Sequence, residues 1–184
     1  MAIAIAIVVL VVAIILALAA LKPDTLSIQR EAHIRAQPET VFALVSDFHR
    51  WYLWAPQDRM DPTMKRSYSG ASDGSGAVSE WDSRGAAGKG RMQITAASAP
   101  TSITVRVDFV KPFAAHNSNE FRFEPEATGT RVTWAMHGTN VYAAKLMSVF
   151  ISMDRMLGKH FEAGVRDLKA AAESQAYAKQ HPQS

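Results

Sequence analysis

The chain has 184 residues, in which 20 Lys and Arg side chains nearly balance 17 Asp and Glu side chains, and it contains no Cys. The absence of Cys excludes disulfides, thiolate nucleophiles and zinc sites built on cysteine. No run of Lys and Arg stands out, so the charge pattern disfavours nucleic-acid binding. Outside an apolar N-terminal segment about 160 residues remain, enough for one domain with its own core.

The first element is a segment without a single polar side chain, residues 2–21. As a helix it would be about 30 Å long, which matches the hydrocarbon thickness of a bilayer. We predict a single-pass transmembrane anchor. A cleaved signal peptide is the alternative, with "ALA" at 17–19 as a cleavage site, but no Lys or Arg precedes the run and the run is long for a signal core. The side of the membrane stays open, because Lys22 after the segment favours a cytoplasmic domain only weakly.

Residues 22–25 form a short juncture, and the domain is expected to span residues 26–175. It begins with "TLSIQREAHIRA", whose alternation predicts a half-buried strand. Arg30 breaks the pattern, because it falls on the apolar face. Pro38 and Glu39 mark the start of a short helix. A second short helix is predicted over about 48–54, where "FHRWYLW" gathers four aromatic side chains.

From about residue 65 to 139 the pattern changes to alternating strands with Gly- or Pro-marked turns, which predicts an antiparallel meander of about six strands. The segment "HNSNEFRFEP" places Asn117, Asn119 and Phe121 on one face. In "TRVTWAMHG" the side chains of Trp134 and Met136 share a face.

A helical region follows to about residue 175, with apolar side chains recurring at three and four, Phe150 and Met153 among them. The region is long for one helix, so we expect a break near Gly158, or between a short lead-in helix and the main helix. Residues 176–184 read as a polar tail. The predicted fold class is α+β: a curved antiparallel sheet of about seven strands around a long C-terminal helix, preceded by the transmembrane helix.

This arrangement resembles the START-like, or SRPBCC, superfamily and its helix-grip (START/Bet v 1-like) fold, most closely the polyketide cyclase/dehydrase-like group. Three stretches carry the resemblance: "IRAQPETVFALVSDFHRWYLWAP", then "SYSG" with "GSGAVSEWDS" and "GKGRMQI", and finally "MDRMLGKHFEAGVRDLKA". It covers about residues 25–172. The resemblance implies a cavity for a hydrophobic ligand between the sheet and the final helix, but it transfers no catalytic residues.

The candidate ligand-binding residues are Arg30, Trp51, Trp54, Trp81, Asn117, Asn119, Phe121, Trp134, Met136, Phe150 and Met153. Each has a structural alternative. The aromatic and Met side chains are the usual content of a core. The two Asn side chains could lie at a hydrated rim, and Arg30 could pair with an acid such as Glu80. Trp51 and Trp54 either close the core or line the cavity mouth as a lid.

No spacing of His, Asp and Glu suggests a metal site, and no nucleophile motif or phosphate-binding loop occurs, so no metal or cofactor is expected. The leading hypothesis is a membrane-anchored domain that binds a hydrophobic small molecule or lipid. The alternative is a lyase of the polyketide cyclase/dehydratase type, for which Arg30, Glu80, Asn117 and His160 are the only polar candidates. A solid structural domain is the third possibility.

Overall fold

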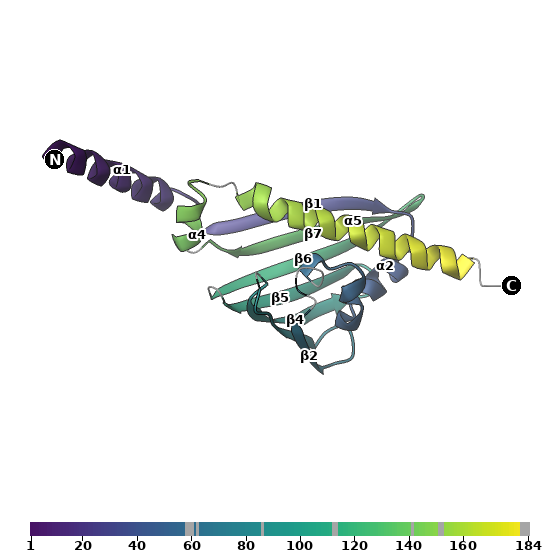
Figure 1. The fold of residues 1–184 in the computed structure, drawn as a ribbon. Helices are drawn as coiled ribbons and strands as arrows, with labels where there is room; N and C mark the ends of the chain where they lie inside the picture. The colour runs from purple at the N-terminus through teal and green to yellow at the C-terminus, as the bar shows by residue number, and fades with distance from the viewer. Residues whose placement is uncertain are drawn as a thin grey trace.

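The computed structural model describes residues 1–57, 61, 63–85, 87–111, 114–140, 142–150 and 153–180. Its elements are α1 (Ala2–Ala20), β1 (Thr25–Ile34), α2 (Pro38–Val45), η1 (Phe48–Leu53), β2 (Lys65–Gly70), β3 (Ala77–Asp82), β4 (Lys89–Ser98), β5 (Ser102–Lys111), β6 (Ala115–Glu126), β7 (Gly129–Thr139), α4 (Tyr142–Met147) and α5 (Met153–Gln180). The strands form one antiparallel sheet in the order β1-β7-β6-β5-β4-β3-β2, and α5 crosses it (Figure 1). The predicted fold is therefore confirmed.

Three details of the helices refine the prediction. The helical region after β7 is interrupted between α4 and α5, so the break separates a lead-in helix from the main one, and α5 runs through Gly158. The helix also continues to Gln180, so residues 176–180 of the predicted tail are helical. The aromatic segment at 48–53 is a 3₁₀ helix, which begins after Asp47 caps the backbone N–H of His49.

Alternation along the strands gives the sheet one apolar face, which is its inner face. The pairing register places Arg30 opposite Trp134 and Trp134 opposite Phe121. The adjacent row across the sheet holds Ile28, Met136, Asn119, Val105 and Ile94, and the next holds Leu26, Gly138, Asn117, Val107 and Met92. The inner face is thus continuous across the sheet from β1 to β4.

The helices cover different parts of this inner face. Helix α5 packs mainly along β1 and against α2, and η1 and β7 contribute less (Figure 1). Helix α2 packs on β5, β6 and β7, and η1 packs on β3. The part of the face near Ile103, Phe121 and Phe123 therefore lies under α2 and η1, whereas the rows through Asn117 and Asn119 lie toward the α1 end.

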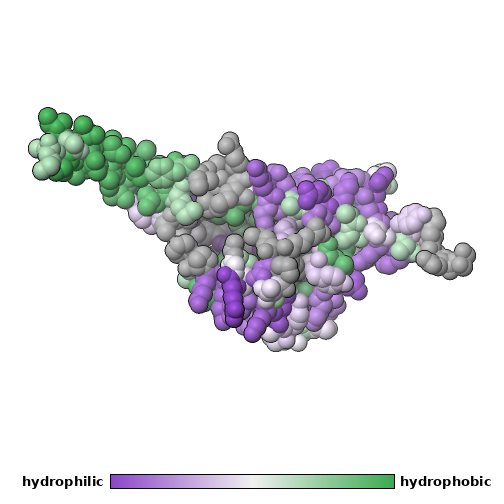
Figure 2. Space-filling model, in the orientation of Figure 1, coloured by the Kyte–Doolittle hydropathy of each residue, from purple (hydrophilic) through white to green (hydrophobic). Residues whose placement is uncertain are grey.

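Helix α1 projects from one end of the domain, and its surface is apolar along its length (Figure 2). Of its residues only Ala19 is buried, and its mean hydropathy is 3.4. The helix is long and apolar enough to cross a membrane, and at this N-terminal place a signal sequence has the same properties.

Candidate functional site

Aromatic rings fill the space between the sheet and the helices on the α2 side. Trp134 stacks on Phe121 with ring centroids 5.0 Å apart, and Phe161 of α5 lies 4.2 Å from Trp134. Trp54 meets the Trp134 ring edge-on at 5.7 Å, and Trp51 packs on Trp54 at 4.8 Å. Such edge-to-face and offset contacts are the favoured geometry of aromatic pairs. This part of the interior is packed with side chains.

Trp51 and Trp54 are held by α2 as well as by the rings. The Trp51 indole N–H donates to the carbonyl of Val45 at 2.9 Å, and that of Trp54 donates to the carbonyl of Leu44 at 3.1 Å. Their side chains are 2% and 0% exposed. Both rings therefore close the core, as the structural alternative predicted. Their role as a lid over a ligand stays a prediction.

The two amides of β6 give the inner face its polar character. Asn119 is 8% exposed, and its side-chain oxygen accepts a hydrogen bond from the Trp134 indole N–H at 3.3 Å. Asn117 is half-buried, and its side-chain oxygen lies over Gly138, whose lack of a Cβ makes room for it. Within the described residues, no group accepts a hydrogen bond from either amide N–H₂. Neither amide nitrogen is among the buried polar atoms of the described residues that lack a partner, so both N–H₂ groups are accessible and available to a ligand.

Arg30 points inward, as predicted, but its partner is not Glu80. Its Nε donates to Glu162 of α5 at 2.9 Å, and its Nη1 donates to the carbonyl of Gln29 at 2.8 Å. Gly158 faces the same guanidinium, and a Cβ there would collide with it. Glu80 alternates with the buried Trp81 and lies on the outer face, 3.9 Å from Arg91. Arg30 therefore pairs with an acid, as one of the alternatives expected, but the example Glu80 is wrong because the position of α5 makes Glu162 the partner.

The remaining candidates separate into buried and exposed positions. Trp81 faces inward over Gly90, 5.5 Å from Phe109, and its indole N–H donates to the carbonyl of Ala87 at 2.9 Å. Met136 is 7% exposed and belongs to the core. Phe150 lies in the turn after α4 and is 69% exposed, so its predicted place on the buried stripe of the long helix is wrong. Met153 begins α5, and its side chain lies outside the described part.

Two further ionisable groups border the inner face. Arg66 of β2 pairs with Trp81, so it shares the inner face, and its Nη1 lies 3.5 Å from the Ser79 hydroxyl. Burial lowers the pKa of Arg66 from its usual value. Arg66 is not among the predicted site residues, although alternation in "KRSYSG" places it on the same face as Tyr68. Burial also lowers the pKa of the His160 imidazole, which favours its neutral form.

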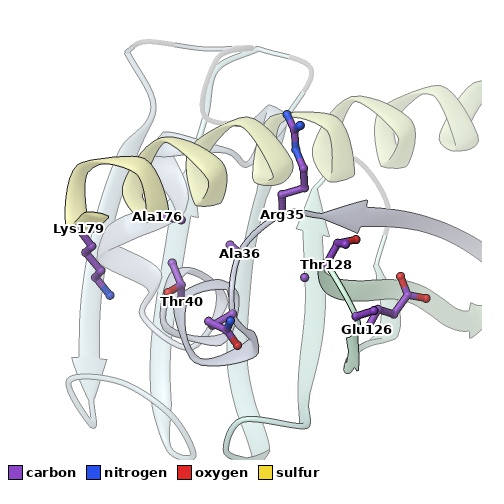
Figure 3. Close-up of a pocket in the computed structure, with 10 residues that line it drawn as sticks. Arg35, Ala36, Thr40, Glu126, Thr128, Ala176 and Lys179 are labelled. Carbon is purple, nitrogen blue, oxygen red and sulfur yellow. The ribbon is translucent and has the colours of Figure 1, made fainter. Parts of the chain in front are cut away.

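An open pocket of about 420 Å³ lies at the other end of the domain, between the start of α2, the β6–β7 turn and the end of α5 (Figure 3). Its lining includes Arg35, Thr40, Glu126 and Lys179. Arg35 lies 3.5 Å from Glu173, and His33 and Arg131 hold the pKa of Glu126 below its usual range. The pocket is polar and does not match the predicted apolar cavity. Among the described residues, no group of three His, Asp or Glu side chains could hold a metal.

The fold recurs in solved structures of low sequence identity. Protein CV1439 from Chromobacterium violaceum has a TM-score of 0.57 at 13% identity, with 83% of this chain and 99% of that chain covered. Ara h 8.0201 gives 0.54 at 11%, with 84% and 99% covered. The di-domain ARO/CYC StfQ from the steffimycin biosynthetic pathway gives 0.59 at 10%, with 83% and 52% covered, so this chain spans about half of StfQ.

These similarities establish the fold, and a match to a family model assigns the chain to a family. No curated protein matches the chain. The sequence model of the family described as "Polyketide cyclase / dehydrase and lipid transport" matches residues 25–173, which is the whole of the domain from β1 into α5. The chain therefore belongs to the polyketide cyclase/dehydrase and lipid transport family of SRPBCC-type proteins.

Proposed function

We propose that the chain is a membrane-anchored domain that binds a hydrophobic small molecule or a lipid on the inner face of the sheet, beside Asn117 and Asn119. The observation that carries the proposal is the pair of inward amides whose N–H₂ groups have no acceptor among the described residues. Around them the face is apolar, with Val105, Val107 and Met136 as neighbours in the sheet. A few polar groups in an apolar surface are typical of sites that orient an apolar ligand by its polar end.

The ligand chemistry follows from the donors. An amide N–H₂ donates to a carbonyl, carboxylate or phosphate oxygen, and Asn119 already uses its own oxygen to accept from Trp134. A chain or ring system with one acceptor group at its end therefore suits this face. Helix α1 places the domain beside a bilayer, which raises the effective concentration of lipid-derived ligands.

Catalysis by a cyclase- or dehydratase-type lyase is the second candidate, because the family description names cyclase and dehydrase beside lipid transport. Its polar candidates do not converge, however. Glu80 lies on the outer face of the sheet, and the charge of Arg30 is compensated by Glu162. His160 is neutral near pH 7, but no described side chain orients it by a hydrogen bond. Binding therefore has the stronger geometric support.

The test is photo-crosslinking of the full chain in lipid nanodiscs with a fatty acid that carries a diazirine near the end of its chain. Mass spectrometry then maps the labelled peptides. We expect labels on the inner-face residues of β4, β5 and β6. Labels confined to α1 and α4 would show that the probe only dissolves in the bilayer, and the proposal would fail.

Two tryptophan substitutions on neighbouring residues of β5 provide a matched pair. Val107 is 4% exposed and faces inward, whereas Arg106 faces outward. Val107→Trp should reduce labelling of β4 to β6 severalfold because its ring occupies the ligand's place, and Arg106→Trp should leave labelling unchanged. Equal labelling in both variants would exclude the inner face as the site.

A further inference from the structure

A group of exposed apolar side chains lies where the domain meets α1. Tyr142 is 50% exposed, Met147 is 45% exposed and Phe150 is 69% exposed, and all three lie on α4 or in the turn that follows it. We call these three side chains the α4 patch. Helix α4 packs against α1, and the exposed apolar surface of α1 begins beside it (Figures 1 and 2).

Four polar contacts join α4 and the preceding Asn140 to α1 and to the juncture that follows it. The Tyr142 hydroxyl donates to the carbonyl of Leu16 at 3.2 Å. The Asn140 side-chain amide donates to the carbonyl of Pro23 at 2.9 Å, and its backbone N–H donates to the carbonyl of Asp24 at 2.7 Å. The buried ammonium of Lys145 forms an ion pair with Asp24. The juncture is therefore pinned to the domain, and α4 keeps a defined height along α1.

That height can be worked out from the helix rise. The apolar run ends at Leu21 and the charged Lys22 follows, so the boundary of the hydrocarbon lies close to these residues. Leu16 precedes Leu21 by five residues, which is about 7.5 Å along a helix axis. Amphipathic helices that lie on membranes are buried by about 5–10 Å at the boundary between headgroups and acyl chains. If α1 crosses the bilayer up to this boundary, the Tyr142 hydroxyl, in contact with Leu16, lies at this depth.

We propose that the α4 patch is a second membrane contact, at which Tyr142, Met147 and Phe150 insert into the surface of the bilayer that α1 crosses. The proposal rests on the proposed anchoring by α1. Tyr is a common residue at the lipid–water interface, because its ring is apolar and its hydroxyl reaches polar groups. Met147 and Phe150 add apolar area at the same end of the domain.

The contact has a consequence for the ligand. Strand β7 ends at Thr139 and leads through Asn140 into α4, and β1 begins at Thr25. The row of the inner face that contains Leu26, Gly138 and Asn117 lies at this end of the sheet. The α4 patch therefore holds the Asn117 end of the inner face toward the bilayer, so that an apolar ligand exchanges with the membrane and not with the aqueous phase.

Because the chain contains no Cys, a single introduced Cys can be labelled at one site. The full chain is reconstituted in phosphatidylcholine vesicles that contain a minor share of phosphatidylglycerol, and Phe150→Cys is labelled with the environment-sensitive fluorophore NBD. Nitroxide-bearing lipids, which quench only fluorophores in contact with lipid, report its depth. Tyr177→Cys is the matched control, since Tyr177 is 66% exposed but lies near the opposite end of α5 (Figure 1). Leu10→Cys reports the anchor itself.

We expect a severalfold loss of emission at positions 10 and 150 and none at position 177. Quenching at position 10 alone would overturn the α4 contact and leave the anchor intact. No quenching at position 10 would overturn the anchor, and the α4 contact with it. A blue-shifted label at position 150 that lipid nitroxides do not quench would mean that protein, such as a second copy of the chain, covers the patch, which also overturns the proposal.

Discussion

Replacing Trp54 by Ala separates the two interpretations of the aromatic segment. The ring is fully buried, packs on Trp51, Phe121 and Trp134, and donates its N–H to the carbonyl of Leu44. Removal of a buried Trp costs about 3–5 kcal/mol, because apolar area is lost and a cavity remains. That is a large share of a typical stability of about 5–15 kcal/mol. At about 2–4 °C per kcal/mol, we expect the melting temperature to fall by roughly 6–20 °C.

Thermal unfolding followed by near-ultraviolet circular dichroism measures this effect, because the signal reports the packing of the tryptophan rings. Tyr52→Ala is the matched control from the same 3₁₀ helix, since Tyr52 is 66% exposed and should change stability by no more than about 0.5 kcal/mol. Trp54→Phe keeps most of the ring but leaves the Leu44 carbonyl without its donor, at a cost of about 1–3 kcal/mol. If Trp54→Ala had the same melting temperature as Tyr52→Ala but exchanged its ligand faster, the core interpretation would be refuted and the lid interpretation supported.

Three further predictions concern α5. Gly164→Ala should destabilise the domain, because the new Cβ would collide with the Trp134 ring and overpacking costs about 1–3 kcal/mol. This cost should exceed the gain of about 1 kcal/mol from the higher helix propensity of Ala. A higher melting temperature for the variant would contradict this packing. For Arg30 and Glu162, a double-mutant cycle with Arg30→Met and Glu162→Gln should give a coupling of at most about 1 kcal/mol that shrinks in salt, since Glu162 is 58% exposed. Because burial lowers the pKa of His160, the unfolded chain takes up a proton on this imidazole at a higher pH than the folded chain does. The free energy of unfolding should therefore be constant above about pH 6.5 and decline as the pH falls below it. In thermal melts across this pH range His160→Gln should flatten the decline, and an unchanged dependence on pH would exclude His160 as its source.

The sheet was predictable because its pattern is local. In β5, Ile103, Val105 and Val107 alternate with polar residues, and an apolar period of two indicates a half-buried β-strand. Alternation also placed Arg30 and Asn119 on the inner face before their neighbours were known. What alternation cannot provide is the partner. Arg30 and Glu162 are separated by 132 positions, and their pairing depends on how α5 lies along β1.

The break between a lead-in helix and the main helix was expected, but the exact residues at which α4 stops could not be predicted, for a different reason. Apolar residues recur at three and four from Leu146 through Phe150, so the periodicity of a helix continues across the place where the helix stops. Periodicity reports a preference for burial, but it does not say which surface covers each residue. Phe150 fits the apolar stripe, yet its ring is exposed. The bilayer proposed as its surroundings would make pattern and exposure consistent.

The boundary between anchor and domain also depends on which property defines it. Hydropathy places it after Leu21, which makes residues 22–25 a linker. Hydrogen bonds instead make the domain begin within residues 22–25. The carbonyls of Pro23 and Asp24 accept from Asn140, and the carboxylate of Asp24 pairs with Lys145. These residues are therefore part of the folded domain, and Thr25 already pairs with Thr139 in the sheet. A juncture held in this way couples the orientation of α1 to that of the sheet. Under the proposed anchoring, α1 would therefore set which end of the inner face meets the bilayer as well as its distance from it.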